Sequence, residues 1–209
     1  MEAERIPAQS RLLGETVVPA SPEFLPFEDG AFDLVIVIDV HEHLAAVAPL
    51  NHEITRILAP GGQALLTTPS GDPGLPLARL KRRLGMTPEV YGHHVQGYTV
   101  EELNTMARAA GLAPEAQGAY SRFFTEAIEL AINFAYVKVL GRSPEGEAPR
   151  EGEIAPTSAE QLEQVGVAWR LYRRVYPILR AASRLDALLP GRGGYAVAIS
   201  ARKPGGAPE

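Results

Sequence analysis

The chain has 209 residues, enough for one domain with a substantial buried core. Hydrophobic residues at 45% and charged residues at 22% are ordinary globular values, which excludes collagen-like and wholly disordered chains. The formal net charge of -5 argues against nucleic acid as a partner, because an acidic protein has no general attraction to phosphate backbones. Cysteine is absent, which excludes disulfides and cysteine-ligated zinc. With a charged N-terminus unlike a signal peptide, this composition predicts a cytoplasmic protein.

The first clear elements are two buried strands separated by a helix. Residues 32–39 form a continuous apolar run, which predicts a strand covered on both faces in a parallel sheet. Residues 63–68 predict a second strand of the same kind. Between the strands, apolar side chains recur at helical spacing and end before Pro60-Gly61-Gly62; they are Leu50, Ile54, Ile57 and Leu58. A strand, a helix and a strand in this order predict a right-handed βαβ unit.

The C-terminal half adds a capped helix, an insertion and a last strand. Thr99 and Glu102 have the spacing of a capping box, which predicts a helix that ends near Gly111. Residues 194–200 predict a late strand. We therefore predict one domain over residues 1–209, with an α/β core at 15–118 and 191–204 and a helical insertion at 121–190.

The insertion contains two predicted helices. The first, at 123–140, is apolar on nearly every side, and the second, at 162–189, carries an aromatic stripe flanked by arginines and a kink at Pro177. The acidic linker at 143–156 is expected to be mobile. Three roles stay open for the two helices: a cap over the site, a homodimer interface, and peripheral contact with a membrane surface.

Three ordered blocks carry a resemblance to a known family. They are residues 25–35 (LPFEDGAFDLV), residues 39–44 (DVHEHL), and residues 53–58 followed by Pro60-Gly61-Gly62. The blocks resemble the second half of class I S-adenosylmethionine-dependent methyltransferases of the methyltransferase 11 type. The resemblance implies a Rossmann-like α/β fold with a mostly parallel sheet and S-adenosylmethionine as cofactor.

The front half of that family pattern is not found in this chain. The family opens with a strand and a glycine-rich turn, followed by an acidic residue for the ribose, whereas this chain has no G-x-G-x-x-G. Only fourteen residues precede the possible strand at 15–18. The sequence therefore predicts a fold that is incomplete at its N-terminus, either through truncation, the favoured explanation, or through true loss in a degenerate homologue.

The resemblance also implies which residues form the site. The cofactor-binding residues would be Ser21, Glu23, Phe24, Asp39, Val40 and Glu42, with Ser21 where the family usually has an Asp for the adenine. His43 and His94 would be catalytic, removing the acceptor's proton. The structural alternatives are that Glu42 and His43 only cap the next helix, and that His93 and His94 are ordinary loop residues. His41, His43 and His52 form only a weak metal-binding pattern, so no metal site is expected.

The predicted function is methyl transfer from S-adenosylmethionine to a small or lipid-like acceptor. The alternative is a non-catalytic methyltransferase-like module that binds a partner. The absence of the glycine-rich turn from the sequence matters for the choice between these two functions, because the backbone amides of that turn would hold the cofactor.

Overall fold

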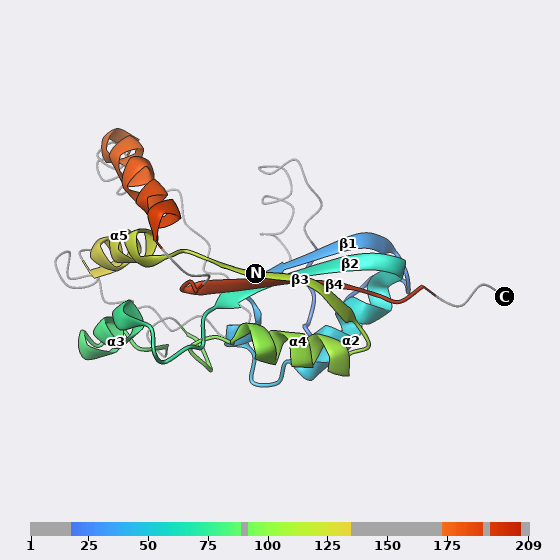
Figure 1. Cartoon of the computed structure of the whole chain (residues 1–209). Helices are drawn as coiled ribbons and strands as arrows, with labels where there is room; N and C mark the ends of the chain where they lie inside the picture. The colour runs from blue at the N-terminus through green and yellow to red at the C-terminus, as the bar shows by residue number, and fades with distance from the viewer. Residues whose placement is uncertain (1–17, 89–91, 135–172, 190–192, 206–209) are drawn as a thin grey trace.

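The computed structural model describes residues 18–88, 92–134, 173–189 and 193–205. Its centre is one four-stranded sheet with helices packed below it and at one end (Figure 1). The strands are β1 (Phe32–Ile38), β2 (Leu58–Pro69), β3 (Ala113–Tyr120) and β4 (Ala196–Arg202). The predicted strand at 15–18 lies outside the described residues except for Val18, which is not in a strand.

The sheet has the order β1-β2-β4-β3. β1 and β2 are parallel, as the βαβ prediction requires, and Val37 pairs with Leu66. β4 runs antiparallel to both of its neighbours, β2 and β3. β4, the last of the described strands, is therefore inserted into the interior of the sheet.

Two amphipathic helices cover one face of the sheet. α2 (Ala48–Ile57) and α4 (Val100–Ala109) lie side by side beneath the strands (Figure 1). Their apolar side chains and those of the strands form the main core, whose largest fully buried apolar residues are Ile54, Leu58, Leu66, Leu103 and Ile199. This packing fixes the direction of β1 and β2 and hence the position of their carboxyl ends.

The helix predicted between the two strands is confirmed, but its end differs. Leu50, Ile54 and Ile57 are buried as expected, and α2 ends at Ile57. Leu58 is already extended and begins β2, so Pro60-Gly61-Gly62 lies within the strand instead of directly ending the helix. A residue before proline disfavours the helical conformation, so Ala59 cannot easily continue the helix.

The predicted capping box is confirmed at the start of α4. The Thr99 side chain accepts a hydrogen bond from the backbone N–H of Glu102, and the Glu102 carboxylate accepts one from the backbone N–H of Thr99. At the other end, Gly111 has φ +87°, the left-handed conformation that follows many helix ends.

One face of β1 is not covered as the sequence predicted. Leu34, Ile36 and Ile38 are 53%, 52% and 62% exposed, so this strand is buried on one face only. β1 is also the edge of the described sheet, which explains the error: a continuous apolar run predicts two covering layers, and only one is described here.

The remaining helices gather at the carboxyl ends of β1 and β2 (Figure 1). They are α3 (Pro76–Arg83), α5 (Phe123–Phe134), a helix at 173–183 and the 3-10 helix η4 (Arg184–Leu188). Asp186 of η4 accepts hydrogen bonds from the backbone N–H groups of Phe124 and Thr125, which ties η4 to the start of α5. None of the described helices is long and apolar enough to span a bilayer. The predicted linker at 143–156 lies outside the described residues.

Candidate functional site

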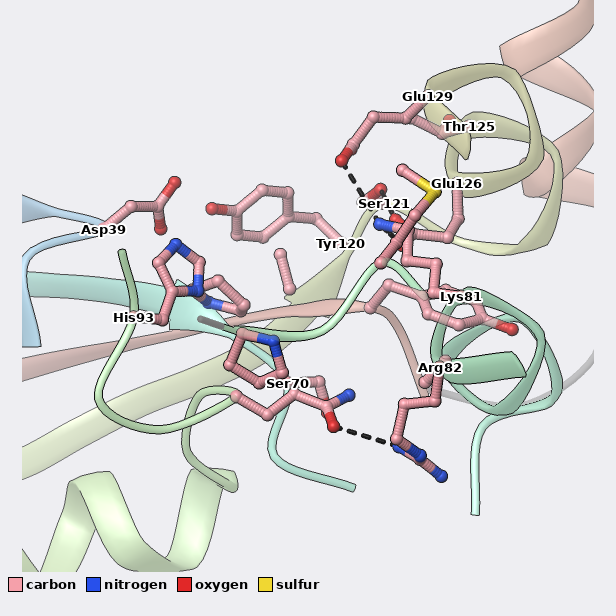
Figure 2. A pocket seen from close by; sticks show the side chains of 17 residues that line it. Asp39, Ser70, Lys81, Arg82, His93, Tyr120, Ser121, Thr125, Glu126 and Glu129 are labelled. Atoms are coloured by element: carbon pink, nitrogen blue, oxygen red, sulfur yellow. Dashed lines mark hydrogen bonds and ion pairs between the residues drawn. The ribbon is translucent and has the colours of Figure 1, made fainter. Parts of the chain in front are cut away.

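A pocket of about 410 Å³ opens at the carboxyl ends of β1, β2 and β3. Ligands in open α/β sheets bind at this edge, where loops leave the strands. Figure 2 shows the side chains that line the pocket, contributed by the ends of the strands, by α3 and α5, and by the loop at 92–98. The polar and charged lining residues include Asp39, Ser70, Lys81, Arg82, His93, Gln96, Tyr120, Glu126, Glu129 and Tyr195.

Asp39 directly follows β1 and has φ 51°, in the left-handed region that most residues avoid. Its backbone N–H donates to the carbonyl of Thr67 at 3.1 Å, and its Oδ1 accepts from the hydroxyl of Thr67, also at 3.1 Å. Both bonds hold the strained residue at the end of the β1-β2 pair. Strain of this kind persists where the surroundings fix it, and it is common at functional sites.

The 3-10 helix η1 (His41–His43) follows Asp39 and carries two buried side chains. His41 Nε2 lies 2.8 Å from Oδ1 of Asn51, and burial lowers the pKa of His41 despite this hydrogen bond. Glu42 accepts a hydrogen bond from the hydroxyl of Thr68 at 3.2 Å, and burial is the main cause of its raised pKa. His41 is thus part of the packing between η1 and α2 and does not face the pocket.

The loop at 92–98 is held against η1 and the end of β2. The backbone N–H of His94 donates to the carbonyl of Glu42 at 2.8 Å, and Nδ1 of His43 lies 3.1 Å from the carbonyl of Gly92. The backbone N–H of Tyr98 donates to the carbonyl of Pro69 at 3.0 Å. Two segments about fifty residues apart are therefore joined at the pocket edge.

These contacts bring His43 and His93 together. Their ring centroids are 4.5 Å apart and the rings meet edge to face. Burial is the main cause that lowers the pKa of His93 to about 4, and the nearby His43 lowers it further. His93 lines the pocket, whereas His94, the residue named from the sequence, is exposed.

The opposite wall of the pocket carries an ion-pair network between α3 and α5. Lys81 Nζ lies 2.5 Å from Oε1 of Glu126 and 3.3 Å from Oε1 of Glu129 (Figure 2). Burial opposes the charge of Lys81, but the hydrogen bond and charge of Glu126 raise the pKa of the lysine. Burial raises the pKa of Glu126 in turn. Through this network, α5 lines the pocket with charged groups that partly neutralise one another.

The first group of predicted cofactor residues lies in a turn at 21–24. The backbone N–H of Phe24 donates to the carbonyl of Ser21 at 3.0 Å, and the backbone N–H of Glu23 lies 3.3 Å from the Ser21 hydroxyl. The chain then continues to Leu25, whose backbone N–H donates a hydrogen bond to Glu53 and whose carbonyl accepts one from Arg56, both residues of α2. Phe24 is exposed. The second group, Asp39, Val40 and Glu42, is at the carboxyl end of β1.

The described residues fit S-adenosylmethionine only in part. Asp39 offers a carboxylate at the strand end, suited to the charged methionine part of the molecule. No strand precedes β1 among the described residues, and the sequence has no glycine-rich turn that would present backbone donors. Among the described residues, only a group suited to one end of the cofactor is therefore present.

Sequence reasoning missed much of the pocket wall. Tyr120 is the end of β3 and Tyr195 directly precedes β4, whereas Glu126 and Glu129 come from a helix that the sequence predicts mainly as apolar. Only the charges interrupting that apolar helix could have indicated its position, because a buried charge needs a partner such as Lys81.

Comparison with known proteins gives two sequence matches. Residues 2–66 match a family model described as a methyltransferase domain. A tocopherol O-methyltransferase of the chloroplast from Arabidopsis thaliana is 44% identical over 43 residues, which are 21% of this chain and 12% of that protein. The chain thus matches only a small part of that relative.

Solved structures with the same fold are more extensive matches. The [4+2]-cyclase SpnF matches with a TM-score of 0.54 and 20% identity, over 95% of this chain and 62% of that one. A SAM-dependent methyltransferase from Thermotoga maritima matches with a TM-score of 0.51 and 19% identity, over 96% of this chain and 70% of that one. At these identities the structures show a common Rossmann-like α/β fold. The family match covers residues 2–66, less than half of the chain, and shows that this part is similar to a methyltransferase domain.

Proposed function

We propose that this chain carries the acceptor side of a methyltransferase site and transfers a methyl group from S-adenosylmethionine to a small acceptor with a hydroxyl group. The observation that carries the proposal is the pocket of about 410 Å³ between Asp39 and α5. Its volume is within the range of small-molecule sites. A lipid-like acceptor would have to leave its tail outside this pocket.

Two tasks fall to the residues of the chain. S-adenosylmethionine, when bound, supplies a methyl group on a sulfonium, from which the acceptor oxygen displaces the sulfur. Tyr120 and Tyr195 offer flat apolar walls that would orient the acceptor, so that its oxygen faces the Asp39 end of the pocket. As the new C–O bond forms, the acceptor must lose its proton, and in this proposal the imidazole pair of His43 and His93 accepts it.

The hydroxyl acceptor is suggested by one relative. The Arabidopsis thaliana match is by name an O-methyltransferase. An oxygen acceptor also gives the imidazole pair a chemical task, because a hydroxyl is a poor nucleophile until its proton is removed. If the acceptor needed no proton removal, neither histidine would have a chemical task in the reaction.

We expect this chain to bind S-adenosylmethionine only weakly, because no glycine-rich turn is present in its sequence. NMR titration suits weak binding. The amides of Asp39 to Glu42 and of His93 should shift on titration. Asp39→Ala should reduce these shifts, whereas Asp33→Ala, an exposed carboxylate at the other end of the same strand, should leave them unchanged. Equal effects of the two substitutions would count against the proposed site.

A second function is kept because the fold serves other reactions. One structural neighbour is a [4+2]-cyclase, so the fold alone does not fix methyl transfer. Incubation of the chain with methyl-labelled S-adenosylmethionine and a panel of small phenols separates the possibilities. Labelled product that is lost in His93→Ala supports methyl transfer. Binding without any transfer supports the non-catalytic module predicted as the alternative.

A further inference from the structure

Three side chains that can bind metal ions converge beside the pocket from two segments. Glu42 and His43 belong to η1, and His93 belongs to the loop at 92–98. One possible ligand atom from each residue lies within 4.8 Å of the other two. No sequence pattern joined these three residues, because His93 lies fifty residues after His43 and the weak histidine pattern comprised His41, His43 and His52.

We propose that Glu42, His43 and His93 form a binding site for a divalent transition-metal ion such as Zn²⁺. Two imidazoles and one carboxylate are the protein ligands of many catalytic zinc sites. Ligands about 2.1 Å from one ion stand about 3.4 Å apart in a tetrahedron, so the cluster must close by little more than about 1 Å. Both histidines are only half-buried, so rotation of their side chains can supply this movement.

The surroundings orient the three groups as they do in metal sites. The Nδ1–H of His43 donates to the carbonyl of Gly92, and this tautomer leaves the lone pair on Nε2. The Thr68 hydroxyl donates to one oxygen of Glu42, which leaves the other oxygen for an ion. The carbonyl of Glu42 also holds the His94 N–H, so the loop that carries His93 is fixed to η1. The cluster is therefore positioned by groups that bind no ion themselves.

Glu42 gives the strongest reason to expect a cation. Its side chain is buried, with the residue only 1% exposed, and within the described ranges it forms no ion pair with a lysine or arginine. A buried carboxylate is costly unless a positive group or a metal ion accompanies it. An ion shared with His43 and His93 would provide that charge.

The other histidines serve as internal comparisons. His41 Nε2 is engaged with Asn51 in the core, and His52 is exposed on α2. Neither is part of the cluster.

Three protein ligands leave at least one coordination position open, and His93 also lines the pocket. A bound ion would lower the pKa of an acceptor hydroxyl that coordinates it, so the hydroxyl would release its proton to water and not to the imidazoles, which would then be ligands. That role depends on the proposed function, whereas metal binding does not.

Metal titration of the full chain, free of any histidine tag, tests the site without an activity assay. Isothermal titration with Zn²⁺ should show one saturable site. His43→Ala, His93→Ala and Glu42→Gln should each weaken binding by at least about tenfold, while His52→Ala should bind as the unchanged chain does. Co²⁺ should give visible absorption bands from nitrogen and oxygen ligands, because the chain has no cysteine.

Circular dichroism of each variant separates lost ligands from lost folding. Glu42→Gln keeps the size of the side chain and can still accept from Thr68, and His93→Gln is the second, polar variant of the loop residue. The proposal is overturned if the unchanged chain shows no saturable Zn²⁺ binding. It is also overturned if folded His43 and His93 variants bind as tightly as the chain itself, or if His52→Ala weakens binding equally.

Discussion

Gly97 is the residue whose backbone most tightly limits the pocket loop. Its φ is +144°, and a Cβ atom at this position would come within 1.9 Å of the carbonyl oxygen of Pro69. That carbonyl accepts the Tyr98 N–H, so any added side chain must separate the loop from β2. No L-residue can take this position without movement of one of the two segments.

We predict that Gly97→Ala releases the loop at 92–98 from the end of β2. Hydrogen exchange at the Tyr98 amide should become faster. The free energy of unfolding should fall by about 2 kcal/mol or more, which thermal denaturation measures as a lower midpoint. Gly118→Ala is the matched control, because a Cβ at Gly118 meets nothing within 4 Å. Unchanged exchange at Tyr98 in Gly97→Ala would contradict the contact described here.

At the level of single residues, the sequence identified the end of β1 but not the histidine at the pocket. Asp39 and His43 follow a strong strand signal, so the edge rule places them correctly at the carboxyl end. His93 and His94 are neighbours in a loop of irregular backbone, and no periodicity determines which one turns inward. Only the hydrogen bonds of the loop to Glu42 and Pro69 decide this.

The capping box of α4 gives an element-level prediction. Thr99→Ala removes the side chain that accepts from the N–H of Glu102 and should lower the free energy of unfolding by about 1 kcal/mol. Thr105→Ala is the matched control, since Thr105 is exposed within the same helix and alanine favours helices more than threonine does. Urea denaturation of both variants checks the prediction. Equal losses at the two positions would mean that the cap contributes little.

The contact between α2 and the segment at 25–29 should be sensitive to acid. Glu53 binds the Arg56 side chain and the Leu25 N–H, and these hydrogen bonds lower its pKa from 4.5 to about 2. A lowered pKa in the folded state stabilises the protein fully above about pH 4.5, and the stabilisation is lost as the pH falls toward 2.

Glu53→Gln should therefore be less stable than the unchanged chain at neutral pH and should approach it in stability as the pH is lowered through this range. Thermal denaturation at a series of pH values between neutrality and the acid limit measures the difference. Glu28→Gln changes an exposed residue of the same segment and is the control. Its stability should change with pH in the same way as that of the unchanged chain. A constant gap between Glu53→Gln and the unchanged chain at every pH would contradict the assigned cause.

Among the elements, those with a strong local signal were predicted best. α2, α4, β1, β2 and β4 all have either helical periodicity or continuous apolar runs. β3 was not predicted, because Ala113–Tyr120 contains proline, glycine and exposed polar residues and has no apolar face of its own. It is a strand because β4 pairs with it, which is a tertiary cause that local sequence does not contain.

At the scale of the whole molecule, the open face of β1 should cause self-association. Leu34, Ile36 and Ile38 expose adjacent apolar side chains on an edge strand, a combination that favours contact between copies. Sedimentation velocity should show concentration-dependent association of the unchanged chain.

Replacing all three residues with threonine, which keeps the preference for strands, should reduce the association. Leu188→Ser, at another strongly exposed position, should not reduce it. A strictly monomeric chain at high concentration would contradict this prediction.

The interior position of β4 sets an order of events during synthesis. β2 and β3 have no contact with each other in the sheet except through β4, and β4 is made after both. As the chain leaves the ribosome, the βαβ unit of β1 and β2 can form early, but β3 must wait for residues 196–202. Until residues 196–202 emerge, we therefore expect β2 and β3 each to have an unpaired edge, which chaperones would protect from aggregation.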